Sequence, residues 1–345
     1  MKKYLLTAVC IIMMSMTASA VSINKALLDH NGEVTLFDGN KIQDAIDAAE
    51  DGDVIYLTLG TFKPFKVTKS ITIKGTGEKS VIDGDVIISI PNNSTLSNPV
   101  LEALAVSGSV NVTAPLTNLV VRQCKVTSSF GIEAEVIGGT IERCKIGTMS
   151  FTGIIQNLTI DRCNVSNGFA LSSTIESMTV MNSYVIGLSA KSGATNNTTF
   201  VNCNLYFSST NNFSGTIINS VVKHCDDCVF GITTLYSTVL VNSLINTRYT
   251  FKTNNTTSLY YMIIGTNCVQ ENCYTESSNS LYTYANYLQE KGYLGTDGTV
   301  VGMYGGDTPY DDNMLVPLVP KVTSSDIKLD NENKVLNVKL TVSPQ

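Results

Sequence analysis

The stretch LTIDRCNVS at residues 158–166 decides the fold, because variants of it recur at regular intervals along the chain. Each variant has an apolar or β-branched pair, then Arg or Asn, then Cys or Ser, then another alternating apolar position. The related stretches are NLVVRQCKV (118–126), GTIERCKIG (139–147), MTVMNSYVI (178–186), TFVNCNLYF (199–207), TIINSVV (216–222) and TVLVNSLIN (238–246). The small residue falls at Cys124, Cys144, Cys163, Ser183, Cys203, Ser220 and Ser243, in steps of 20, 19, 20, 20, 17 and 23 residues. A period near 20 residues is typical of a solenoid, in which each repeat forms one coil.

The local chemistry of the repeat indicates which solenoid this is. The repeats are rich in Val, Ile and Thr, alternate with period two, and hold Gly, Asn and Ser between the apolar runs. They lack the 3.6-residue apolar spacing of helical repeats and the regular leucines of a leucine-rich repeat. We therefore expect an all-β parallel β-helix with about three short strands per coil, in which the apolar residues and the Cys or Ser point inward.

The polar residue before each Cys or Ser is expected at a bend between two strands. These residues are Arg143, Arg162, Asn182, Asn202, Asn219 and Asn242. Asn tolerates the left-handed backbone that such a bend requires, and stacked Asn amides can hydrogen-bond from coil to coil.

The N-terminal flank predicts a cap on this stack. Ile42, Ala45, Ile46 and Ala49 line one face of a short helix that Gly52 ends, and strands follow at 53–59 and 70–74. A helix over the first coil covers an edge that would otherwise be open for pairing.

This flank resembles the pectin-lyase-like superfamily of right-handed parallel β-helices. The resemblance is carried by the amphipathic helix, GDVIYL (52–57), GTF (60–62) and SITIKGTG (70–77). At the far end, YLGTDGTVVGMYGGDTPY (293–310) resembles the last coil of secreted β-helix proteins of Bacteroidetes whose activity is undefined. The resemblance implies a right-handed parallel β-helix over most of the chain, and its motifs specify no activity.

Three regions follow from these patterns. Residues 1–20 have the layout of a secretory signal peptide, with Lys2 and Lys3, a short apolar core, and a small-residue cleavage site at Ala18–Ala20. Residues 21–308 form the β-helix with its helical cap. Residues 309–345 form an extended segment and a β-hairpin, whose strands at 326–329 and 335–342 flank the turn DNEN.

The signal peptide predicts export to the periplasm, the cell surface or the medium. A membrane anchor is the alternative, but the apolar run is too short to span a bilayer. A lipid anchor at Cys10 is a second alternative, but Val9 precedes this cysteine where a small residue is expected. No later apolar run reaches membrane-spanning length, so no membrane span is expected.

Charge and composition exclude several classes of partner. The 345 residues include 23 Lys or Arg and 29 Asp or Glu, a net charge of −6. Without Lys2 and Lys3 the balance becomes 21 − 29 = −8. Nucleic acid and anionic lipid both require clustered positive charge, so neither is expected as a partner. Two His and no Trp leave few general bases and metal ligands, and we expect no metal or cofactor.

The cysteines allow two interpretations. The eight cysteines that follow the signal peptide, an even number in an exported protein, are compatible with disulfides. Cys124, Cys144 and Cys163 share one repeat position that Ser takes elsewhere, which favours a ladder of buried thiols. Local disulfides within Cys225–Cys228 or Cys268–Cys273 stay open as alternatives, and a zinc site is disfavoured for lack of four ligands.

Asp226 and Asp227 are the candidate catalytic residues. The element DDC that they begin resembles the DDC element of polygalacturonases, which share the expected fold. The resemblance implies that Asp226 protonates the leaving oxygen and that Asp227 helps to activate water for inverting hydrolysis. The other motifs of that family, NTD, GHG and RIK, have no counterpart at the matching positions. A solvated turn is therefore the alternative for this pair.

Arg143, Arg162, Lys125 and Lys145 are the candidate binding residues. They fall near one another in consecutive coils and could form a basic stripe for an acidic glycan. The alternative is that they are solvated side chains paired with Glu142 or Asp161.

The missing catalytic residues favour a non-catalytic secreted or cell-surface protein that binds a glycan or a surface partner along a polar strand face. One alternative is a hydrolase or lyase acting on acidic polysaccharide. Another is a structural component of an envelope or matrix.

Overall fold

The computed structural model describes residues 24–90, 95–191, 196–207, 213, 215–223, 239–241, 244–246, 263–264, 269–271, 288–290, 292–316, 321–330 and 335–343. The chain divides into two compact units, Met1–Leu315 and Val316–Gln345.

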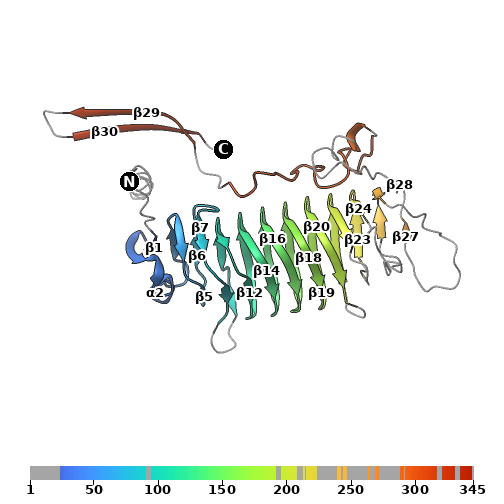
Figure 1. The fold of residues 1–345 in the computed structure, drawn as a ribbon, viewed down its shortest axis with the longest axis horizontal. Coiled ribbons are helices and arrows are strands. Elements are labelled where there is room, and N and C mark those ends of the chain that lie inside the picture. Colours follow the sequence, from blue (N-terminus) through green and yellow to red (C-terminus); the bar gives the residue numbers. More distant parts are fainter. Residues whose placement is uncertain are drawn as a thin grey trace. The chain divides into compact units, whose positions relative to one another are not determined.

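The first unit is a parallel β-solenoid with roughly 20 residues per coil, which confirms the predicted fold class (Figure 1). Each coil contributes a strand to sheet A and a strand to sheet B. The stacked strands of sheet A are β3 (Val54–Leu57), β6 (Thr72–Lys74), β10 (Val100–Glu102), β13 (Leu116–Arg122), β15 (Val136–Glu142), β17 (Ile155–Asp161), β19 (Ile175–Met181), β21 (Asn196–Val201), β23 (Gly215–Ile218), β25 (Val239–Val241) and β27 (Ile263–Ile264), and β9 (Leu96–Ser97) pairs with β13.

In the early coils, sheet B consists of short strands, and in the following coils two such strands are joined into one longer strand. Its main path is β4 (Gly60–Phe62), β7 (Ser80–Ile82), β11 (Ala105–Val106), β14 (Lys125–Ile132), β16 (Lys145–Phe151), β18 (Asn164–Leu171), β20 (Tyr184–Ala190), β22 (Asn204–Phe207), β24 (Val221–Lys223), β26 (Leu244–Asn246) and β28 (Val269–Glu271). The first coils add a third strand each: β5 (Phe65–Val67), β8 (Val86–Ile88) and β12 (Val110–Val112).

Among the described coils, the three separate strands expected per coil are therefore present in the early ones. β11 and β12 both pair with β14, so the second and third strands of a coil have become one strand there. A register shift between Val126 and Ser129 keeps a bulge where the two pieces join. The bulge bends the strand without breaking its ladder.

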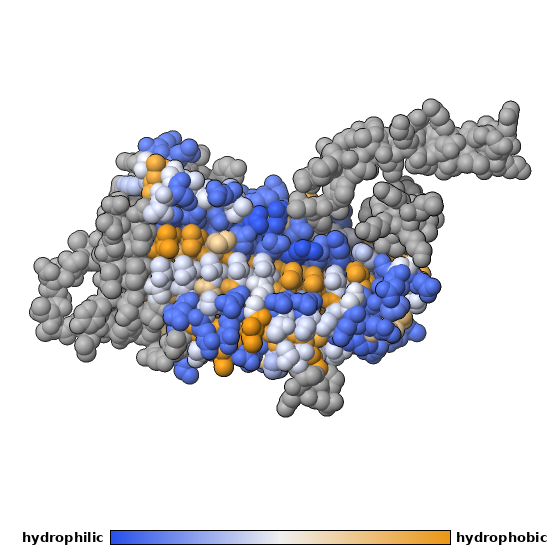
Figure 2. Space-filling model, turned by 180° about the vertical axis from the view of Figure 1, so that it is seen from behind, coloured by the Kyte–Doolittle hydropathy of each residue, from blue (hydrophilic) through white to orange (hydrophobic). Residues whose placement is uncertain are grey.

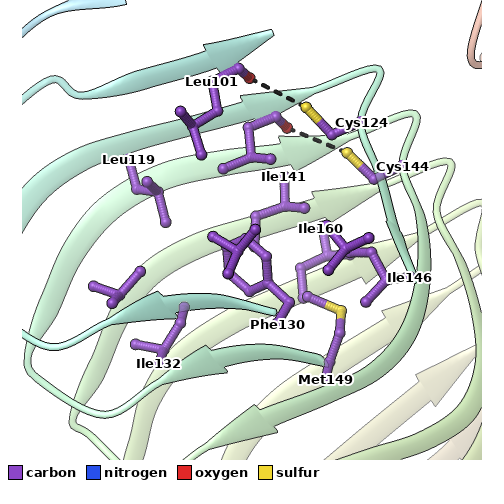
Figure 3. Close-up of a cluster of buried hydrophobic side chains, with 14 of the residues drawn as sticks. Leu101, Leu119, Cys124, Phe130, Ile132, Ile141, Cys144, Ile146, Met149 and Ile160 are labelled. Carbon is purple, nitrogen blue, oxygen red and sulfur yellow. Dashed lines mark hydrogen bonds between the residues drawn. The ribbon is translucent and has the colours of Figure 1, made fainter. Parts of the chain in front are cut away.

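Inward rows of apolar side chains form the core between the sheets. Sheet A contributes Val121, Ile141, Ile160, Val180, Phe200 and Ile217, and sheet B contributes Phe130, Met149, Phe169, Leu188 and Phe207. Figure 3 shows part of this core, with Phe130 and Met149 facing Ile141 and Ile160. The ring centroids of Phe151 and Phe169 lie 5.3 Å apart. Burial of each such side chain contributes about 1.5–3 kcal/mol.

A single left-handed residue turns the chain from sheet A to sheet B. Gln123, Arg143, Arg162, Asn182, Asn202 and Asn219 have φ values of 47–55°. The prediction named six bend residues. It is confirmed at five of them, and the remaining one, Asn242, lies outside the described residues. The bend does not interrupt the coil-to-coil hydrogen bonds, since Arg143 N donates to Asp161 O at 2.9 Å.

The expected amide bonds between coils are replaced by bonds to another segment. The side-chain amides of Asn182, Asn202 and Asn219 donate to residues between 296 and 305. The bend places these amides on the outside of the solenoid, where that segment lies.

The cysteine ladder is confirmed for the described part of the chain. Cys124, Cys144, Cys163 and Cys203 are free and buried. Each thiol lies within hydrogen-bonding distance of the carbonyl oxygen two residues earlier, as Cys144 Sγ does with Glu142 O at 3.2 Å. Figure 3 shows the thiols of Cys124 and Cys144 on neighbouring coils. Burial raises the pKa of Cys203 to about 12. The two alternative disulfides, Cys225–Cys228 and Cys268–Cys273, lie outside the described residues.

The N-terminal cap contains the predicted helix and an unpredicted hairpin. Helix α2 (Ile42–Ala48) follows the 3₁₀ turn η1 (Gly39–Lys41) and ends before Ala49, earlier than the expected stop at Gly52. Ile42, Ala45, Ile46 and Ala49 are buried, as the amphipathic pattern predicted. Strands β1 (Lys25–His30) and β2 (Glu33–Asp38) form an antiparallel hairpin that extends sheet A beyond β3.

The second unit contains the predicted C-terminal hairpin. Strands β29 (Lys321–Asp330) and β30 (Val335–Ser343) pair antiparallel, and both are longer than the sequence pattern indicated.

Candidate functional site

A segment from the end of the first unit lies across the bends of the solenoid. This returning segment, Tyr293–Leu315, contacts residues at the bends or at the start of the strand that follows, in reverse order along the stack. The pairs are Thr296 with Asn219, Asp297 with Asn202, Gly305 with Asn182, Tyr310 with Asn164, and Asp311 with Arg143. It therefore crosses the coils from the later ones back toward the earlier ones.

Glycines allow the returning segment to approach the bends closely. A Cβ atom on Gly306 would lie 2.3 Å from Asn202 Nδ2, and one on Gly302 would lie 2.4 Å from Asn204 Oδ1. Both glycines also have positive φ, 77° and 94°. A side chain at either position would force either the asparagine amide or the segment itself to move.

Apolar side chains fix the same segment. Met303 and Met314 have no exposed surface, and they form a cluster with Tyr310 and Leu315 against Tyr184. Burial raises the pKa of Tyr310 to about 12. This close packing makes the returning segment a part of the folded solenoid.

The four predicted binding cations all contact groups of this chain. Arg143 Nη2 lies 3.2 Å from Asp311 Oδ2, and Lys145 Nζ donates to the carbonyl oxygen of Asp312 at 3.5 Å. Arg162 Nη2 lies 2.7 Å from Asp161 Oδ2 and 3.7 Å from Glu142 Oε2, and Lys125 Nζ lies 2.7 Å from Glu78 Oε1. Lys125 and Lys145 are in register on neighbouring coils, as the spacing indicated. Their role in binding stays a hypothesis.

The predicted catalytic pair, Asp226 and Asp227, lies outside the described residues. Its hydrolytic role is therefore a hypothesis from sequence alone.

The outer face of sheet A carries a row of threonines that the sequence analysis did not single out. Thr140, Thr159, Thr179, Thr199 and Thr216 are directly in register on five successive strands, β15 to β23. All five are half-buried. Figure 2 shows a pale, weakly polar band that crosses the described surface, with hydrophobic side chains gathered along part of it. The sequence signal was a Thr four residues before the ladder Cys or Ser in five consecutive repeats.

A second row runs beside the threonines, two residues further along each strand. It passes through Glu102, Arg122, Glu142, Asp161, Met181, Val201 and Ile218. The side chains of this second row are thus charged in the early coils and apolar in the later ones.

The charged half of the second row is internally paired. Glu102 lies 2.8 Å from Lys74 Nζ and 2.7 Å from Arg122 Nη2. Burial alone would raise the pKa of Glu102, but the hydrogen bonds from Lys74 and Arg122 outweigh it and lower the pKa. This part of the face therefore offers little uncompensated charge.

Asp161 stands at the border between the charged and the apolar half. The residue is 8% exposed, and burial raises the pKa of its carboxyl group although Arg162 opposes the shift. Arg162 contacts Oδ2, whereas Oδ1 is buried and accepts no hydrogen bond within the described part of the chain. Asp161 lies on the outer face with Thr159, two residues before it on β17.

The described residues contain no group of three or more His, Cys, Asp or Glu residues placed to hold a metal ion. No described helix has the length and apolar character needed to cross a membrane.

Comparisons of the chain with protein-family models, with curated proteins and with solved structures gave no match.

Proposed function

We propose that this protein is an exported, non-catalytic binding protein that holds a glycan or a surface partner along the polar outer face of its solenoid. The observation that carries the proposal is the row of five threonines in register on sheet A. Stacked strands lie about 4.8 Å apart, so each coil presents the same hydroxyl at a fixed interval.

A repeated row suits a repeated ligand. Each threonine hydroxyl offers one donor and two acceptor positions, which matches the hydroxyls of successive sugar units. Strands of a sheet hold these side chains more rigidly than a loop would, so less conformational freedom is lost when a ligand binds.

Export and family membership are parts of the same proposal. The signal-peptide layout of residues 1–20 supports export. The motifs of the N-terminal flank support a place in the pectin-lyase-like superfamily, and residues 293–310 support a bacterial origin. Neither feature specifies a reaction, and the hydrolase hypothesis depends on Asp226 and Asp227 alone.

Retention and cleavage should be measured together on one panel of polysaccharides. The purified chain is run through gels that contain neutral or uronate-rich polymers, and each polymer is then analysed for reducing ends and unsaturated products. We expect retarded migration with at least one polymer and no product. Retardation by none would contradict the binding function. Product formation that is lost in Asp226→Ala would support the hydrolase hypothesis instead.

A further inference from the structure

We infer that the ligand is a neutral, extended polysaccharide that lies along the solenoid axis over the threonine row and the apolar row beside it. This inference rests on the proposed binding function and names the face, the ligand class and the residues.

The later coils present an amphipathic strip. Thr179, Thr199 and Thr216 alternate on their strands with Met181, Val201 and Ile218, so a hydroxyl row runs beside an apolar row through three coils. A sugar ring has polar edges and apolar C–H faces. An extended glycan can therefore place hydroxyls on the threonine row and C–H groups on the apolar row.

The charges of the chain favour a neutral ligand over an acidic one. Arg143, Arg162, Lys125 and Lys145 are each engaged with carboxylates or carbonyl oxygens of this chain. Binding a polyuronate through them would require these contacts to break. The net charge of −6 for the whole chain adds a general repulsion of polyanions.

The test uses a matched pair of polymers. One is a soluble β-1,4-glucan and the other is the same backbone oxidised at C6, so that a charged carboxylate replaces each primary hydroxyl and the rest of the sugar unit is unchanged. β-1,4-Mannan and β-1,4-xylan extend the neutral set, and polygalacturonate and alginate extend the acidic set. Binding of the full chain is measured by affinity electrophoresis and by calorimetry.

Two variants locate the site. The double variant Thr179→Val/Thr199→Val removes two hydroxyls and keeps the shape. Thr148→Val on sheet B is the matched control, because Thr148 is also half-buried but lies on the other sheet. Thermal unfolding of each variant checks that the fold is retained.

We expect retention by at least one neutral polymer, no retention by the oxidised glucan, about tenfold weaker binding in the double variant and unchanged binding in the control. Binding to acidic polymers only would overturn this inference and leave the proposed function standing. Binding that the double variant leaves undiminished would overturn the site. Binding to no polymer would contradict the proposed function itself.

Discussion

A left-handed residue followed by a small buried one sets the geometry of every regular coil. Arg143 makes the bend at a φ of 53°, and Cys144 then turns inward before sheet B begins at Lys145. Ser183 and Ser220 replace Cys at the same position, with hydroxyls that donate to the carbonyl oxygens two residues earlier. The ladder therefore requires a small side chain that can donate a hydrogen bond, and both Cys and Ser meet that requirement.

Another pair of residues makes the N-terminal cap sensitive to pH. His30 Nδ1 lies 2.9 Å from Asp53 Oδ1, and this hydrogen bond, with the charge of Asp53, raises the pKa of His30 above 6.5. A raised pKa in the folded state stabilises the protein below the unfolded pKa, and the contribution is lost as the pH rises through the folded value. We expect faster hydrogen exchange in β1 and β3 at pH 8.5 than at pH 5.5, beyond the intrinsic change in exchange rate.

The variant His30→Gln keeps a hydrogen-bonding side chain without a titratable ring. Protection of β1 and β3, corrected for intrinsic exchange, should then be independent of pH across the same range. An undiminished pH dependence in His30→Gln would show that another group is responsible. Strands β15 and β17, which are distant in the stacking order, serve as the internal reference.

At the scale of elements, the returning segment joins coils that are otherwise linked only to their neighbours. A solenoid gains its stability from contacts between adjacent repeats. The returning segment adds hydrogen bonds to five coils and the buried side chains of Met303 and Met314. It therefore opposes local opening of the later coils.

Two glycines of this segment provide a matched test of its contact with the bends. Gly306→Ala places a methyl group against Asn202, whereas Gly298→Ala adds one where no atom lies within 4 Å. Both glycines have a φ near 76°, at 77° and 75°, so the backbone strain of the two substitutions is similar. We expect Gly298→Ala to lower the free energy of unfolding by about 1 kcal/mol and Gly306→Ala by about 2–4 kcal/mol.

Urea denaturation measures both values, and limited proteolysis shows whether the segment has become accessible. Equal losses in the two variants would mean that the contact with the asparagine row contributes nothing. Faster cleavage within residues 293–316 in Gly306→Ala alone would support the close approach.

These elements differ in how far their sequence reveals them. The bends were predictable because Asn or Arg at one repeat position has a local physical cause. The β1–β2 hairpin was also predictable, since Asn31 and Gly32 form the turn that such hairpins favour, but the pair was overlooked. The returning segment was not predictable, because the need for its glycines arises from close contact with asparagines about 80 to 120 residues earlier in the chain.

The features of the candidate site also differ in how far the sequence reveals them. The threonine row could have been found from the repeat alignment, since Thr precedes each small residue by four positions in five repeats. The pairing of Arg162 with Asp161 and Glu142 was predicted, as the alternative to a binding role. The contacts of Arg143, Lys145 and Lys125 could not be predicted, because Asp311, Asp312 and Glu78 are distant in sequence from the cations they contact. The unpaired oxygen of Asp161 depends on packing at a single coil, which the repeat pattern does not specify.

At the scale of the first unit, the core is a row of nearest-neighbour contacts, so a cavity should act according to its place in the row. Phe169 lies in the middle, with ring centroids 5.3 Å from Phe151 and 6.0 Å from Phe200. Phe62 lies on β4 at the start of sheet B, and both side chains are almost fully buried. Truncation of either to Ala removes a similar apolar volume and costs about 3–5 kcal/mol locally.

The two variants should nevertheless unfold differently. In Phe169→Ala the weakened contact divides the stack, so we expect the main unfolding transition to shift by the full cost. In Phe62→Ala the first coils can open while the remaining coils stay stacked, so we expect a separate early transition and a smaller shift of the main one. Hydrogen exchange along the chain distinguishes the two, with lost protection confined to β3–β8 in Phe62→Ala. An identical single transition in both variants would show that the first unit unfolds as one cooperative block, because a break at its end would then cost as much as a break at its centre.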